Sequence, residues 1–260
     1  MIHSPHLPRR QSGAFTLMEL LVEIAIILIL AVITLPVLNV IRSRSNKVTA
    51  LSVMKNLGAA AGNYASQNDG VFPKEDSKGS DTWSTAGDPE NDKAWYNTLP
   101  RQLGAKGVGD YVAQPRDFYT KQNLLYLPGA IYPPDDKKLT RPFFAIAINT
   151  KLQRKDEEGK KTPLRMANIT EPSRTVLFLE QGLPDEKEYK LSVQPKYDGS
   201  PKGSAKSFAA RYSGQGILTY VDGHSDSVDA KDLLTETGQF PFPPIGVVWC
   251  RTADENPNKQ

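Results

Sequence analysis

A long apolar stretch near the start of the chain limits what this sequence can fold into. Residues Phe15–Leu38 read FTLMELLVEIAIILILAVITLPVL, and Glu19 and Glu23 are the only charged side chains in this stretch. As one helix, residues 15–41 would be about 40 Å long at roughly 1.5 Å per residue, which is enough to cross a bilayer.

A secretory signal peptide would also place a basic segment before an apolar one. Residues 1–14 are polar and basic, and Arg9 and Arg10 predict that the N-terminal end of the helix stays in the cytoplasm. However, the apolar stretch is long, it carries two glutamates, and no A-x-A site follows Leu35. We therefore expect a membrane helix that stays in the mature protein.

Glu19 is the most informative residue of the stretch, because an ionised carboxylate in a membrane helix costs roughly 2.5–3.5 kcal/mol and normally has a partner. The segment GAFTLMELLVEIAI resembles the prepilin motif of type IV pilins and type II secretion pseudopilins. In that family a membrane peptidase cuts before the Phe and methylates the new amine. The resemblance implies a leader of residues 1–14 and a processing site at Gly13, Ala14 and Phe15. It also implies that Glu19 pairs with the α-amino group of Phe15 on a neighbouring subunit, which would fix the axial register of packing.

Glu23 departs from the common pattern of this family, in which an apolar residue is usual. It lies one helical turn past Glu19, so the two carboxylates share a face of the helix and repel each other. Either Glu23 is protonated in the membrane, or it finds a second cation in the fibre.

From Val37 onward the sequence becomes amphipathic, with apolar residues at helical spacing and basic residues between them. We expect one helix over about Phe15–Gln67 that stops at the Asn68-Asp69-Gly70 turn signal. Residues 15–41 would be the membrane and assembly segment, and residues 42–68 would be a continuation that packs on a globular head. The apolar positions are Ile41, Val48, Leu51, Met54, Leu57 or Gly58, Ala61, and Tyr64 or Ala65.

Residues 69–260 are expected to form the head. Ala94–Pro100 predicts a helical turn, the mixed-charge run Lys151–Lys161 an exposed loop or hairpin tip, and Leu183–Ser207 a long excursion between strands. The expected fold class is α+β: one long helix packed on a small antiparallel sheet, as in pilins. Short β-branched or aromatic runs predict the strands at Phe143–Ile148, Thr175–Glu180, Gly216–Val221 and Gly246–Cys250.

A second resemblance covers the head. The order of WYNTLP, RPFFAIAIN, ITEPSRTVLFLEQG and RYSGQGILTYVDGHSDSV looks like a subgroup of pseudopilin-like proteins from planctomycete and verrucomicrobial bacteria. That subgroup is named for a His separated by nine residues from an Asp-Gly pair near the C-terminus. Here Asp222 and Gly223 are present and His224 follows them, but Tyr212 stands in place of the naming His.

Composition and the absence of known motifs exclude several classes of function. Lys plus Arg total 32 and Asp plus Glu total 29, and a net charge of +3 is too small for a typical nucleic-acid binder. Cys250 is the single cysteine, which excludes an internal disulfide framework and any CxxC motif. His3 and His6 lie in the leader, so multi-histidine zinc sites are excluded as well. No G-x-S-x-G elbow, Gly-rich phosphate loop or HExxH motif occurs, and we expect no enzymatic activity.

The acids near the C-terminus allow two other interpretations. Asp222 and His224 are common acid–base partners, but a tight turn with Gly223 at positive φ also accounts for them, and we expect the turn. Major pseudopilins often bind calcium near the C-terminus, and Asp222, Asp226 and Asp229 offer hard oxygen ligands for Ca²⁺. The alternative for these three acids is a solvated turn. We expect no other cofactor.

With the resemblance, these features predict a structural subunit of a type IV pilus-like or type II secretion pseudopilus fibre. Its partners would be copies of itself and related pilins, a prepilin peptidase, the inner-membrane assembly platform and membrane lipid. It would lie in the inner membrane with its N-terminus in the cytoplasm and its head in the periplasm, and later in a periplasmic or surface fibre. The alternative is a membrane-anchored periplasmic binding module or hydrolase that uses the helix only as a tether.

Overall fold

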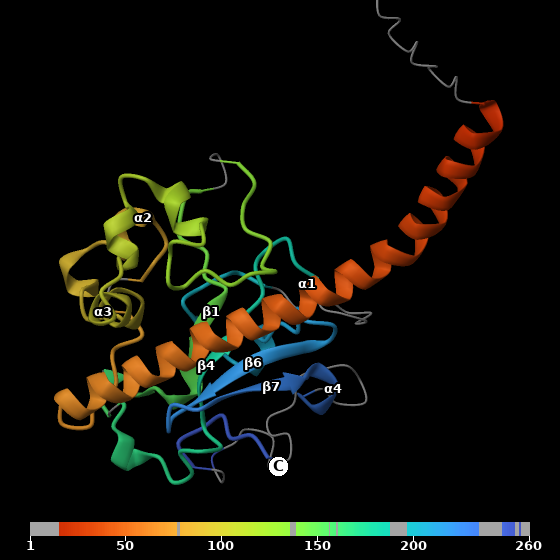
Figure 1. Cartoon of the computed structure of the whole chain (residues 1–260). Helices are drawn as coiled ribbons and strands as arrows, with labels where there is room; N and C mark the ends of the chain where they lie inside the picture. The colour runs from red at the N-terminus through yellow and green to blue at the C-terminus, as the bar shows by residue number, and fades with distance from the viewer. Residues whose placement is uncertain are drawn as a thin grey trace, which may run out of the picture. The chain divides into compact units, whose positions relative to one another are not determined.

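The computed structural model describes residues 16–76, 79–135, 139–155, 157–159, 161–187, 197–233, 246–252 and 255 (Figure 1). The chain divides into two compact units, Met1–Arg42 and Ser43–Gln260. The helices are α1 (Leu17–Gln67), α2 (Trp83–Ala86), α3 (Trp95–Gln102) and α4 (Ala230–Leu233). The strands are β1 (Ile146–Asn149), β2 (Arg154–Lys155), β3 (Lys161–Thr162), β4 (Val176–Glu180), β5 (Lys202–Gly203), β6 (Gln215–Tyr220) and β7 (Ser225–Asp229).

α1 ends where the sequence predicts. Asp69 and Gly70 both have positive φ, at 53° and 74°, which is the backbone conformation that closes many helices. The N–H of Gly70 donates to the carbonyl oxygen of Ala65 at 2.8 Å and so satisfies one of the last free carbonyls of the helix. The single long helix is therefore confirmed from Leu17 to Gln67.

The second half of α1 packs on the head through one stripe of side chains. Ala50, Met54, Leu57, Ala61 and Ala65 are all at most 2% exposed, at spacings of three and four residues. The predicted stripe is wrong at its start: Ile41 and Val48 are 55% and 65% exposed. At 100° per residue, Val48 lies on the side of the helix opposite to the buried Leu57, so helical geometry places it in solvent.

The head contains a five-stranded sheet in the order β5-β1-β4-β6-β7. The pairs β1–β4, β4–β6 and β6–β7 are antiparallel as expected, but β5 pairs with β1 in parallel, so the sheet is mixed. β5 has only two residues and lies inside the predicted excursion Leu183–Ser207, where the sequence predicts no strand because such a short strand leaves no apolar pattern.

Three of the four predicted strands are confirmed as β1, β4 and β6. The prediction at Gly246–Cys250 is wrong, because that segment contributes only an isolated bridge from Val248 to Thr175. β7 was not predicted: its sequence, SDSVD, is polar, and this edge strand forms through backbone pairing with β6. The charged run at Lys151–Lys161 does form a hairpin, in which β2 pairs with β3.

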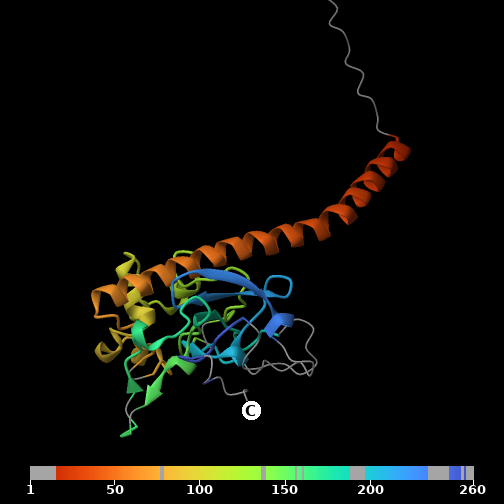
Figure 2. The ribbon, with the colours of Figure 1, turned by 90° about the horizontal axis from the view of Figure 1, so that it is seen from below.

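Both faces of the sheet are covered. Ile146 and Ile217 face the layer that contains the second half of α1, whereas Ala147 and Leu218 face a second cluster with Phe208 and Trp249. Figure 2 shows the second half of α1, from Ser43 onward, along one side of the sheet. The alternation of strand residues between these clusters is the ordinary period of two in a buried strand.

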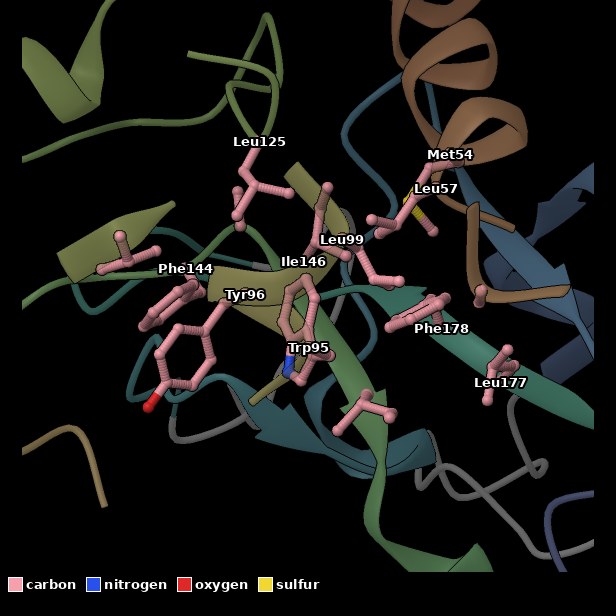
Figure 3. Packing of buried hydrophobic residues seen from close by; sticks show 14 of the residues in the cluster. Met54, Leu57, Trp95, Tyr96, Leu99, Leu125, Phe144, Ile146, Leu177 and Phe178 are labelled. Atoms are coloured by element: carbon pink, nitrogen blue, oxygen red, sulfur yellow. The ribbon is translucent and has the colours of Figure 1, made fainter. Parts of the chain in front are cut away.

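α3 confirms the predicted helical turn at Ala94–Pro100 and anchors an aromatic core. The Trp95 ring lies 5.2 Å from Phe178 of β4, and its indole N–H donates to the carbonyl oxygen of Pro201 at 3.0 Å. Figure 3 shows Trp95 and Tyr96 packed among Phe144, Ile146 and Phe178.

Candidate functional site

The predicted processing residues Gly13, Ala14 and Phe15 lie outside the described residues, whereas Glu19 lies in the first turn of α1. Its Oε2 accepts hydrogen bonds from the backbone N–H and the hydroxyl of Thr16, at 2.9 and 2.8 Å. The backbone N–H of Glu19 in turn donates to the Thr16 hydroxyl oxygen at 3.2 Å.

This reciprocal arrangement is a capping box, which satisfies free N–H groups at the start of a helix. Its T-x-x-E signature is present in the sequence at Thr16–Glu19 and could have been recognised there. Within the single chain, Glu19 therefore has a local structural role. Its pairing with a neighbouring amine remains a prediction.

The first half of α1 carries a large apolar surface. Every Leu, Ile, Val and Met from Leu17 to Ile41 is between 47% and 78% exposed. Among the described residues, α1 is the one helix long and apolar enough to cross a membrane. Exposed apolar surfaces of this extent are typical of membrane or protein contact surfaces.

The three predicted calcium ligands do not gather in one place. Asp222 lies in the turn between β6 and β7, where its Oδ1 accepts from the backbone N–H of His224 at 3.1 Å. Asp226 and Asp229 are three residues apart in β7 and thus on opposite faces of the strand. In the part of the chain that the structure describes, no three His, Cys, Asp or Glu residues are arranged to hold a metal ion.

Asp222 and His224 do face each other across the turn. The two are joined by a 2.6 Å contact between Asp222 Oδ1 and His224 Nδ1, and the imidazole stacks on Tyr220 at 4.3 Å. Gly223 between them has a φ of 93°, as the turn interpretation requires. Asp222 and His224 thus find hydrogen-bond partners in each other within a half-exposed turn.

Tyr212, which stands where the resemblance to the pseudopilin-like subgroup would place a His, is 3% exposed and contacts a buried ionic cluster. Its hydroxyl lies 3.0 Å from Oε1 of Glu180, the last residue of β4. Arg211 contacts both Glu180 and Glu186, and the three charged side chains are at most 7% exposed. Burial raises the pKa of Glu180 to about 7, although the Arg211 charge and the hydrogen bonds from Tyr212, Arg211 and the Ile217 N–H oppose this rise.

No motif or periodicity in the sequence predicts this cluster. Glu180 and Arg211 are 31 residues apart, and isolated Glu and Arg residues usually lie on the surface. The one available indication was the position of Glu180 at the end of the apolar run VLFLE.

A cavity of about 660 Å³ lies between the end of α1 and the β2–β3 hairpin. Two buried carboxylates line it, and both are paired: Lys161 Nζ contacts Glu75 at 2.6 Å, and Lys202 Nζ contacts Asp76 at 3.1 Å. Apolar walls come from residues such as Phe72. The volume falls in the usual range for small-ligand sites.

Comparison of the chain with protein-family models, with curated proteins and with solved structures found no match.

Proposed function

We propose that this protein is a structural subunit of a type IV pilus-like or type II secretion pseudopilus fibre. The observation that carries the proposal is the division of α1. Its first half exposes apolar side chains from Leu17 to Ile41, and its second half supplies the buried stripe of a folded head. A helix of this kind suits a subunit that is stored in a membrane and then packs against other copies of the same helix.

The prepilin-like motif before α1 adds a route into the fibre. A prepilin peptidase would cleave between Ala14 and Phe15 and methylate the new amine. The subunit would wait in the inner membrane, N-terminus in the cytoplasm and head in the periplasm, until an assembly platform adds it to the fibre. Its work would be mechanical, with no reaction catalysed.

Glu19 would have two successive roles in this scheme. In the isolated subunit its carboxylate caps α1 through Thr16. In the fibre it would pair with the amine of Phe15 on a neighbour, because two opposite charges removed from water stabilise each other when they are paired.

Mass spectrometry of the mature N-terminus tests the processing step. We expect a chain that begins with methylated Phe15; an unprocessed chain, or one cleaved after Leu35, would contradict the proposal.

Two substitutions separate the roles of Glu19. Glu19→Gln keeps a side chain that can complete a capping box but removes the charge, whereas Glu19→Val removes both. We expect both variants to insert and be processed, and both to fail in fibre assembly. Normal assembly of Glu19→Gln would remove the charge-pairing argument and leave only the cap.

A membrane-anchored binding module is the second candidate, and the 660 Å³ cavity beside Glu75 favours it. A tether needs neither processing at Phe15 nor a carboxylate at position 19. The same mass spectrum and the same two variants therefore decide between the candidates.

A further inference from the structure

The buried cluster at the end of β4 contains more acids than bases. Arg211 holds Glu186 with two bonds, from Nε to Oε1 at 2.9 Å and from Nη2 to Oε2 at 2.5 Å. A third and longer contact, 3.2 Å, runs from Nη1 to Oε1 of Glu180, which is fully buried. One guanidinium thus faces two carboxylates. Since Glu186 already neutralises Arg211, an ionised Glu180 would leave one uncompensated negative charge out of water.

The hydrogen bonds of the Tyr212 hydroxyl give independent evidence on whether Glu180 is protonated. Its hydroxyl oxygen lies 3.1 Å from the carbonyl oxygen of Pro128 and 3.0 Å from Oε1 of Glu180. A hydroxyl has one proton, and a carbonyl and an ionised carboxylate can only accept. With Glu180 ionised, one of these two contacts would have no proton in it. With Glu180 protonated, Oε1–H donates to the Tyr212 oxygen, and the Tyr212 O–H donates to Pro128.

Oε2 of Glu180 accepts the backbone N–H of Ile217 at 2.9 Å, whereas Oε1 is the oxygen that faces the Tyr212 hydroxyl. Oε1 is therefore the atom that would carry the proton. The charge count and the donor count lead to the same protonation state.

We propose that Glu180 binds a proton in the folded head, and that loss of this proton turns the Tyr212 hydroxyl away from Pro128 and toward the Glu180 carboxylate. The proton goes to solvent, the Tyr212 proton changes its acceptor without leaving its oxygen, and Arg211 stays charged. The raised pKa of Glu180, about 7, places this change near neutral pH.

The groups around Glu180 come from several segments. Arg211 and Tyr212 lie in the turn before β6, and Glu186 lies after β4. Tyr132 approaches Tyr212 from the loop Leu127–Tyr132. On α1, the ammonium of Lys47 donates to the Gln215 side chain at 2.8 Å.

The consequence falls on the loop Leu127–Tyr132. Tyr212 holds this loop at Pro128, and Glu186 holds it through the N–H of Ile131 at 2.8 Å. The same loop lies beside α1, since a Cβ built on Gly129 would be 3.6 Å from Nδ2 of Asn46. Loss of the Glu180 proton should therefore weaken the packing of the loop against α1 around Asn46. This inference does not depend on the proposed function.

Difference infrared spectroscopy of the full chain in detergent micelles tests the bound proton directly. Subtracting the spectrum of Glu180→Gln from that of the wild type should leave the C=O band of a protonated carboxylic acid below pH about 7, and the band should vanish above it. In Glu186→Gln, Glu180 becomes the remaining counterion of Arg211, so its band should disappear at lower pH. Absence of any Glu180-dependent band one unit below pH 7 would overturn the proposal.

Hydrogen exchange of residues 127–132 tests the switch without relying on Glu180→Gln. Relative to its intrinsic rate, the wild-type loop should exchange about fivefold faster above the transition, the effect of one net hydrogen bond. Tyr212→Phe should exchange fast at every pH. The matched control Tyr220→Phe, at a buried tyrosine of β6, should behave as the wild type. A pH-dependent step that persists in Tyr212→Phe would overturn the switch.

Discussion

Gly58 of α1 and Gly223 of the β6–β7 turn meet backbone to backbone. A Cβ added at Gly58 would lie 2.7 Å from the carbonyl oxygen of Gly223 and 2.6 Å from Cγ2 of Thr219. Just beside this contact, the Thr219 hydroxyl donates to the carbonyl oxygen of Met54 at 3.2 Å. The helix thus approaches the sheet as closely as the absence of a side chain allows.

Gly58→Ala should therefore destabilise the head. The added methyl group meets a backbone carbonyl that cannot rotate away, and overpacking of this kind costs about 1–3 kcal/mol. The gain in helix propensity, about 0.5–1 kcal/mol, offsets only part of that cost. Thermal unfolding of the full chain in detergent micelles measures the net loss.

Gly62→Ala is the matched control, since it makes the same substitution one turn later in α1. Nothing lies within 4 Å of a Cβ built there, so only the propensity gain of about 0.5–1 kcal/mol should remain. Equal effects of the two substitutions would show that the contact between Gly58 and Gly223 does not limit the packing of α1.

The second stability prediction concerns Trp95, which joins α3 to the sheet. Trp95→Phe removes the indole N–H that donates to Pro201 and leaves space beside Phe178. The unsatisfied carbonyl and the cavity together should cost about 2–4 kcal/mol. Thr98→Ala on the same helix, at a half-buried position, should change stability by less than about 0.5 kcal/mol. A Trp95→Phe chain as stable as the wild type would contradict this account of the core.

Whether a helix or strand can be predicted from the sequence depends on which interactions stabilise it. α1 and the strands β1, β4 and β6 were predictable, because their buried side chains leave apolar patterns. β5 and β7 were not, because they form through backbone bonds that any polar sequence can make.

The same reasoning applies to the candidate sites. The Thr16–Glu19 capping box is local and could have been predicted from T-x-x-E. The cluster of Glu180 with Arg211 joins residues 31 apart, and only the folded sheet brings them together. For Asp226 and Asp229 the strand itself was missed, and with it the fact that the two acids point to opposite faces.

The third prediction concerns calcium. Because Asp222, Asp226 and Asp229 do not converge, we expect the Tm of the protein to be the same with calcium and with a chelator. A calcium site filled at 100 times its Kd would add about 2.7 kcal/mol. That stabilisation corresponds to a shift of about 5–10 °C for a chain of this size. A shift of that size that is lost in Asp226→Asn would establish the site.

The last prediction concerns stability at acid pH, where Asp110 is the relevant group. Its carboxylate accepts two bonds from Arg101, at 2.7 and 3.1 Å, and one from the N–H of Gly107. The Arg101 hydrogen bond is the main reason why the pKa of Asp110 lies below its ordinary value of 3.8. A lowered pKa contributes stability that is present above the ordinary value and is lost as pH falls through the folded one.

Asp110→Asn should therefore lower stability at neutral pH by about 0.2–1 kcal/mol, the range for ion pairs exposed to this degree, and should have less effect in strong acid. Glu180 acts with the opposite sign: its pKa is raised, so its contribution is complete below 4.5 and is lost as pH rises to about 7. In a profile of Tm against pH, the fall of Tm in acid should thus be smaller in Asp110→Asn than in the wild type. The fall of Tm as pH rises toward neutral should be smaller in Glu180→Gln. Because the two carboxylates share no partner, the double variant should show the sum of both changes. A single variant that altered both limbs would contradict the assignment of separate groups to the two pH ranges.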